Sequence, residues 1–112
     1  MYEGRDVEIN NRIGRALLGI LPEHAESITA KAIVEDDWSE VGFEYKDAAG
    51  NAGHFTHDAN PDDVADQIAD ALDELRTLMT EHGETAWNRS DFTAHRNGEF
   101  NVTFAYENDP QL

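Results

Sequence analysis

The sequence contains no cysteine and few basic residues. Its 112 residues include 8 Lys and Arg against 24 Asp and Glu, which gives a formal charge of −16. Without cysteine the chain can form neither disulfides, zinc-thiolate sites nor a thiolate nucleophile, a composition that suits a reducing cytoplasm. The negative charge should repel nucleic acid and anionic membranes, so we expect neither as a partner. A protein partner should therefore be basic, unless the acidity serves only solubility or a salty cytoplasm.

Long apolar runs are also missing. No stretch approaches the roughly 18 apolar residues of a membrane span, and the first residues lack the basic flank and apolar run of a signal peptide. Apolar residues make up 39% of the chain, which is enough to bury a core without disulfides or a structural metal. We therefore expect residues 1–112 to form one cytoplasmic domain.

Apolar residues at helical spacing predict two amphipathic helices, over residues 6–21 and 61–81. The first should end before Pro22, which cannot continue a helix. The second should begin at Asn60-Pro61, because Asn can cap free N–H groups and Pro fits the first helical position. The apolar stripes of these helices predict surfaces that pack on a sheet.

Alternating apolar residues predict the strands of that sheet. Asn97-Gly98 predicts a two-residue type I′ turn between the last two strands. The element order predicts an α+β fold, in which two helices pack on one face of an antiparallel sheet of four or five strands. The strands are expected at about residues 27–34, 40–46, 54–57, 87–96 and 99–107, and the core should contain Ile13, Leu17, Phe43, Ile68, Leu72, Leu75 and Phe104.

No residue pattern indicates catalysis. The scattered histidines suggest no triad, and the glycines form no phosphate-binding motif, so we predict no catalytic residue and no cofactor. The nearest approach to a metal site is His54, His57 and Asp58. Residues three apart on a strand point to opposite faces, so we predict no metal. A metal-dependent hydrolase would require these residues to converge.

The second predicted helix carries acidic residues along one side. Like charges one turn apart cost roughly 0.2–0.5 kcal/mol per pair, and Asp is a poor residue inside a helix. A surface that keeps one sign of charge at this cost is typical of an electrostatically steered binder, although a merely solvated face is the alternative. We predict partner contacts at Asp62, Asp66, Asp70, Asp73 and Glu74, with Glu40 and Glu44 adjoining, and with Trp38 as either a binding anchor or a packed side chain.

Several segments together resemble the YezG-like family of bacterial immunity proteins. The resemblance lies in Leu21-Pro22-Glu23 after the first helix, in the strand Val41-Gly42-Phe43-Glu44-Tyr45 and in His57-Asp58 before the acidic helix. Its most specific part is Trp87 followed by the ending Gly98-Glu99-Phe100-Asn101-Val102-Thr103-Phe104-Ala105-Tyr106-Glu107.

The resemblance implies an intracellular antitoxin of a polymorphic toxin system. Such a protein binds and neutralises the C-terminal domain of a toxin, often a nuclease, and has no catalytic residues of its own. An acidic secretion chaperone has a similar size and element order, and would be distinguished by an obligate dimer. The residues themselves indicate no particular oligomeric state.

Overall fold

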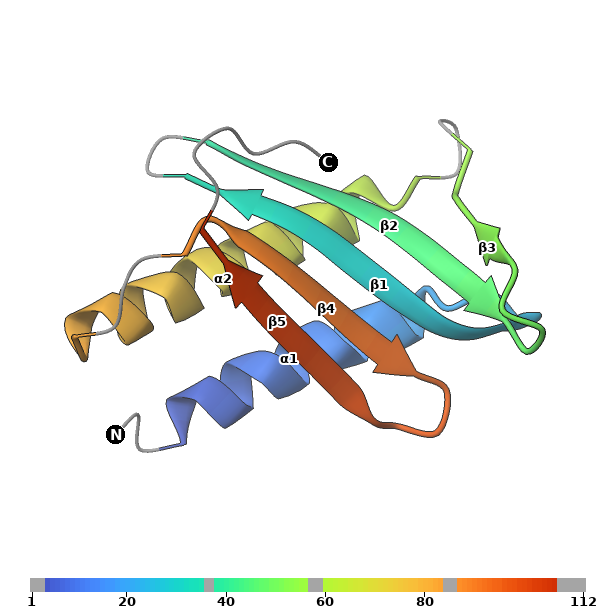
Figure 1. The fold of residues 1–112 in the computed structure, drawn as a ribbon, viewed down its shortest axis with the longest axis horizontal. Coiled ribbons are helices and arrows are strands. Elements are labelled where there is room, and N and C mark those ends of the chain that lie inside the picture. Colours follow the sequence, from blue (N-terminus) through green and yellow to red (C-terminus); the bar gives the residue numbers. More distant parts are fainter. Residues whose placement is uncertain (1–3, 36–37, 57–59, 84–86, 107–112) are drawn as a thin grey trace.

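A computed structural model describes residues 4–35, 38–56, 60–83 and 87–106. They form α1 (Arg5–Gly19), β1 (Ala25–Val34), β2 (Ser39–Asp47), β3 (Ala52–Gly53), α2 (Asp62–Glu81), β4 (Arg89–His95) and β5 (Phe100–Ala105). The strands make one antiparallel sheet in the order β3-β2-β1-β4-β5. Both helices lie behind this sheet in Figure 1, so no described helix covers its front face, which we call the open face. The predicted α+β architecture is confirmed.

The hydrophobic core lies between the helices and the sheet. β1 is the central strand, and its side chains Ile28, Ala30, Ala32 and Val34 are buried in this core. α1 packs against β1 and β4, whereas α2 packs against β1 and β2. The predicted core residues Ile13, Leu17, Phe43, Ile68, Leu72 and Leu75 are buried, and Phe104 is half-buried against them.

The helix boundaries differ slightly from the predictions. α1 ends at Gly19, two residues early, because Ile20 N–H turns to the Leu17 carbonyl at 3.1 Å. α2 begins at Asp62, and Asn60 is not its side-chain cap: the Asn60 amide donates to the Asp62 carboxylate at 2.6 Å. Of the helices among the described residues, neither is long and apolar enough to cross a membrane.

The third strand was predicted too late in the chain, at residues 54–57. The structure pairs Ala52 and Gly53 with β2 instead. Asp47 explains the difference, because its side chain accepts hydrogen bonds from Ala49 N–H and Asn51 N–H, both at 2.9 Å, and closes the turn early. The bonds from Asn51, followed by the one from Ala49, hold the pKa of Asp47 below its usual range.

The loop between β4 and β5 contains Asn97-Gly98 but runs over the four residues 96–99, so the predicted two-residue turn is wrong. His95 N–H bonds the Glu99 carbonyl at 2.8 Å, and Gly98, with φ 94°, donates back to the His95 carbonyl at 2.9 Å. Arg96 is drawn out of the hairpin because its backbone N–H bonds the Glu26 carbonyl. Its guanidinium also donates to the carbonyls of Ala25 and Pro22, at 2.9 and 2.7 Å, which ties the hairpin to the start of β1 and to the segment before it.

Candidate protein-interaction surface

The side of α2 that faces away from the sheet is acidic. Its buried residues, Ile68, Ala71, Leu72, Leu75 and Leu78, form the opposite side of the helix. The acidic side chains are all exposed, as the alternation of charge and apolarity predicted, and they are Asp62, Asp63, Asp66, Asp70, Asp73, Glu74 and Glu81. We call Asp62, Asp66, Asp70 and Asp73 the acidic surface.

The acidic surface has no compensating cation within the described residues. No ion pair there involves Asp66, Asp70 or Asp73. The basic residue of α2, Arg76, instead donates through Nε to the Trp87 carbonyl at 2.7 Å. The i,i+4 repulsion between Asp66 and Asp70 is therefore retained in the folded chain.

Glu74 differs from its acidic neighbours because it faces α1. Arg12 Nη2 donates to Glu74 Oε2 at 2.7 Å, and Arg5 Nη2 lies 3.9 Å from Oε1. The hydrogen bond from Arg12, supported by the charges of Arg12 and Arg5, holds the pKa of Glu74 below its usual range despite some desolvation. Glu74 therefore joins the two helices, and a partner would have to compete with Arg12 for it.

Trp38 lies next to the centre of the acidic surface. A groove of about 230 Å³ separates it from α2 and is lined by Val34, Glu35, Trp38, Ser39, Ala69, Asp70 and Asp73. The indole remains 46% exposed, so it is not a core residue. The structure thus brings an exposed aromatic ring and two carboxylates, which are far apart in sequence, to one groove.

A second groove, of about 240 Å³, runs between α1 and α2. It is lined by Arg12, Ile13, Ala16, Gln67, Ile68, Asp70 and Ala71. Asp70 borders both grooves. A partner that rests on α2 at Asp70 would therefore contact the mouths of both grooves.

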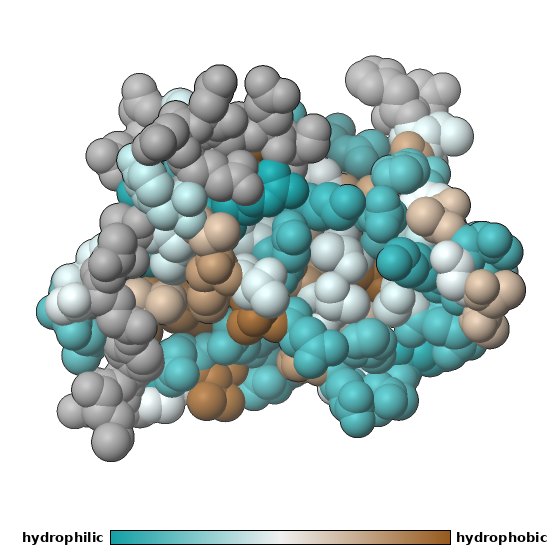
Figure 2. Space-filling model, viewed as in Figure 1, coloured by the Kyte–Doolittle hydropathy of each residue, from teal (hydrophilic) through white to brown (hydrophobic). Residues whose placement is uncertain are grey.

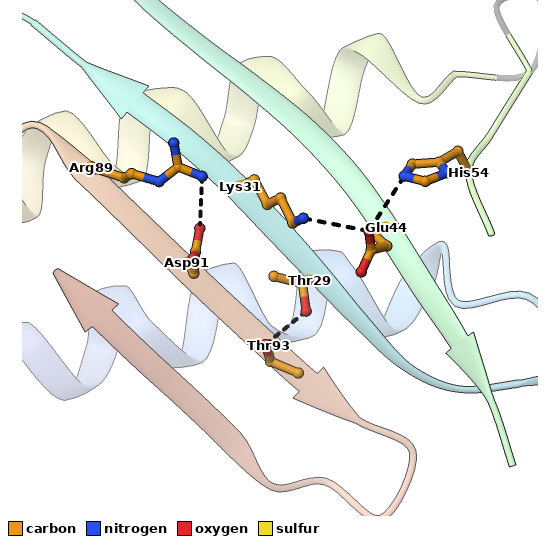
Figure 3. Close-up of polar contacts among 7 residues, drawn as sticks. All are labelled: Thr29, Lys31, Glu44, His54, Arg89, Asp91 and Thr93. Atoms are coloured by element: carbon orange, nitrogen blue, oxygen red, sulfur yellow. Dashed lines mark hydrogen bonds and ion pairs between the residues drawn. The ribbon is translucent and has the colours of Figure 1, made fainter. Parts of the chain in front are cut away.

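Glu40 and Glu44 do not adjoin the acidic surface. Side chains alternate along β2, and Phe43 belongs to the core on the helix side, so Glu40 and Glu44 lie on the open face of the sheet. Figure 3 shows Glu44 there, between Lys31 and His54, at 3.4 Å from the nitrogen of each. The alternation of β2 in the sequence already contained the information needed to separate these residues from α2.

The open face of the sheet is polar and internally paired. Thr29 and Thr93 hydroxyls meet at 2.7 Å across β1 and β4, and Arg89 Nη2 lies 3.9 Å from Asp91 Oδ1. Figure 3 shows these side chains on the face that the helices leave open. In Figure 2 this view is largely hydrophilic over β1 and β2, whereas hydrophobic residues gather towards β5. Lys31, Glu44, Arg89 and Asp91 on this face thus have ion-pair partners, unlike the carboxylates of the acidic surface.

The described residues contain no group of three or more metal-ligating side chains. His54 is paired with Glu44, while His57 and Asp58 lie outside the described residues. The prediction that these three residues hold no metal therefore stays a prediction.

Comparison with known proteins places the whole fold in one family. The model of the immunity protein YezG-like family matches residues 7–111, from α1 through β5. The chain belongs to this family. It is also similar to the type VII secretion system protein EsaG of Staphylococcus aureus (strain NCTC 8325 / PS 47), with 26% identity over 114 residues that cover 94% of this chain and 70% of EsaG. The resemblance inferred from the residues is confirmed. The residues that match the YezG-like model include α2 and the strands β1 and β2.

Proposed function

We propose that this chain is an antitoxin that binds and neutralises a cognate toxin domain through the acidic surface. Membership of the YezG-like immunity family carries the proposal, because immunity proteins bind the toxins they neutralise. The acidic surface supports it, since Asp66, Asp70 and Asp73 are exposed and unpaired among the described residues. Binding a basic partner would relieve their mutual repulsion.

The chemistry of the acidic surface favours a nuclease as the toxin. A nuclease holds phosphate with clustered Lys and Arg, and such a cluster is complementary to carboxylates spaced one helical turn apart. Trp38 adds an exposed ring at the edge of the same surface, and a cation over an indole face is an additional favourable contact. The antitoxin would then cover the phosphate-binding surface and exclude nucleic acid.

The test uses the purified cognate toxin domain, for which the genes next to that of this chain are the first candidates. Replacing Asp66, Asp70 and Asp73 with Lys should weaken the affinity by about 2–5 kcal/mol if these carboxylates are desolvated in the complex. Isothermal titration calorimetry measures the affinity of the folded variant, and stopped-flow kinetics measures its association rate. Unchanged affinity and association rate would exclude this side of α2 as the interface.

A charge-matched control separates local contact from overall charge. Glu23 and Glu26 are exposed and lie at or just before the start of β1, away from α2, and β4 separates them from the outer edge of β5. Replacing these two with Lys changes the net charge by as much as Asp66→Lys/Asp70→Lys does, and should leave the affinity nearly unchanged. An equal loss in both variants would mean that net charge alone governs binding. A Glu40→Lys/Glu44→Lys variant tests whether the contact also reaches the open face.

The alternative function is a secretion chaperone. The chaperone alternative is supported by the relative EsaG, which is named a type VII secretion system protein. The size, acidity and element order of this chain are also compatible with a secretion chaperone. A chaperone of this kind should be an obligate dimer that captures an extended segment of a secreted protein. Sedimentation equilibrium of the free chain tests this: a stable dimer would favour the chaperone, and a monomer the antitoxin.

A further inference from the structure

The free edge of the sheet at β5 carries no charge. β5 is the last strand in the sheet order, and no described segment lies beside its outer edge in Figure 1. Its residues, Phe100–Ala105, include no Asp, Glu, Lys or Arg, although 29% of the chain is charged. At the opposite edge, β2 carries Glu40, Glu44 and Lys46 and is partly covered by β3. Natural sheets usually protect their edges as β2 does, with charged side chains or a covering segment.

The backbone of β5 presents a regular row of unpaired groups along this edge. His95 N–H bonds the Glu99 carbonyl at 2.8 Å, and the strand pair continues with Ala94 opposite Phe100. Because antiparallel residues alternate, the residues that bond β4 are Asn101, Thr103 and Ala105. The N–H and C=O groups of Phe100, Val102 and Phe104 therefore point outward, and they have no hydrogen-bond partner among the described residues.

α1 extends this uncharged region beyond the strand. The ring of Phe100 packs directly against Gly14, where an added Cβ would clash with it. Residues one and two turns from Gly14 share its side of the helix, and these are Val7, Asn10 and Leu18. They too are uncharged, and Val7 is 56% exposed. Figure 2 shows the hydrophobic residues of this view gathered towards β5.

We propose that an extended segment of the toxin adds to the outer edge of β5 as a further strand of the sheet. The identity of the partner rests on the proposed antitoxin function. An extended backbone satisfies the outward groups of Phe100, Val102 and Phe104. Because β5 carries no charged side chain, the segment is uncharged where it pairs with the strand. Basic residues elsewhere on the toxin then face the acidic surface of α2.

A second copy of this chain is a poorer occupant of the same edge. Pairing β5 with itself would bring together two molecules that each carry a formal charge of −16. A basic toxin domain meets the same edge with charge attraction instead of repulsion. β5 and the acidic surface then form two separate contacts, because α1 lies between α2 and the β5 edge (Figure 1).

Amide hydrogen exchange at single residues tests the proposal directly. In the free protein the amides of Phe100, Val102 and Phe104 should exchange fast, while those of Asn101, Thr103 and Ala105 exchange slowly. Binding of the cognate toxin domain should protect the first three. Slow exchange of these three amides in dilute free protein would show that the edge is not free and would overturn the proposal.

A pair of variants at Val102 isolates the outward hydrogen bond. Val102→Pro removes an N–H that points away from β4, which an edge strand tolerates, whereas Val102→Ala removes side-chain packing and keeps the N–H. Val102→Pro should bind the toxin domain about tenfold more weakly than Val102→Ala, the effect of about one lost hydrogen bond. Circular dichroism checks that both variants are folded. If either is unfolded, the hydrogen-exchange experiment on the unmodified chain still tests the proposal.

The outcomes separate this proposal from the proposed function. A toxin that binds without protecting the three amides overturns strand addition and leaves the antitoxin function intact. A toxin that does not bind overturns both. Protection that appears in concentrated free protein together with a dimer assigns the edge to a second copy and overturns the toxin as its occupant.

Discussion

The acidic surface of α2 and the edge of β5 are opposite kinds of surface on one small protein. The first has exposed carboxylates that form no ion pair among the described residues, and the second has no charged side chain along six residues. Charge acts over about 8–10 Å at physiological salt and governs how fast partners meet, whereas backbone hydrogen bonds act at contact distance and govern how long they stay. The difference suggests that α2 attracts a partner and that β5 retains it.

The salt dependence of association should separate the two surfaces most strongly. In Asp66→Lys/Asp70→Lys/Asp73→Lys the association rate at low salt should fall by about 10- to 100-fold, because steering is lost. In Val102→Pro the rate and its salt dependence should stay unchanged while dissociation becomes faster. Stopped-flow or surface-plasmon kinetics at two salt concentrations measures both rates. Similar changes in the two variants would remove the distinction between attraction and retention.

The packing of β5 on α1 should be sensitive to the addition of a single methyl group at Gly14. Gly14→Ala places a Cβ against the Phe100 ring and should lower the free energy of unfolding by about 1–3 kcal/mol, as overpacking does. Gly19→Ala is the matched control, because nothing lies within 4 Å of a Cβ there and Ala favours helix. Urea denaturation measures both. If Gly14→Ala is as stable as the control, β5 is free to move away from α1.

Two isosteric substitutions on α2 should change the stability of the free protein in opposite directions. Asp70→Asn removes like-charge repulsion with Asp66 and should raise the free energy of unfolding by roughly 0.2–0.5 kcal/mol. Glu74→Gln removes the charge that Arg12 holds and should lower it by about 0.2–1 kcal/mol, since the pair is partly exposed. Thermal unfolding at low salt compares them. A loss of stability in both would mean that the acidic surface is compensated after all.

The smallest effect concerns pH. The pKa of Glu74 is lowered in the folded chain, so the stability that its pairing with Arg12 contributes is fully present above the unfolded pKa. It is lost as the pH falls from the ordinary pKa of a glutamate through the lower pKa of the folded chain. The stability difference between the unmodified chain and Glu74→Gln should therefore shrink over this range in urea titrations. A difference that stays constant down to pH 3 would show that the charge of Glu74 contributes nothing.

The elements with strong periodicity were predictable from the sequence. The apolar stripes gave both helices to within two residues at each end, and the alternation of residues 27–34 and 40–46 gave the β1–β2 pair. The acidic surface also followed, because helical geometry alone fixes which residues of α2 share a side. These features depend on neighbours in the sequence, and the tertiary contacts agree with them.

The features that depend on distant residues were not predictable in this way. Nothing near Arg96 in the sequence shows that Glu26 and Ala25 will bind it and lengthen the hairpin loop. Glu74 likewise meets Arg12 across 62 residues. Trp38 could be recognised as a candidate anchor, but its place beside Asp70 and Asp73 required the packing of β2 on α2. The absence of charge from β5 was visible in the sequence, and its meaning depended on the strand lying at an edge.

The strand order also affects how the chain folds as it is synthesised. β1 is made early and pairs with β2 soon afterwards, but its other neighbour, β4, lies about 60 residues further along the chain. Until residues 89–95 emerge from the ribosome, one side of β1 has no partner, and α1 lacks part of the surface on which it packs. Pairing over such a separation is slow, and an unpaired apolar strand is prone to aggregate while it waits. The high negative charge of the nascent chain would oppose that aggregation by keeping copies apart.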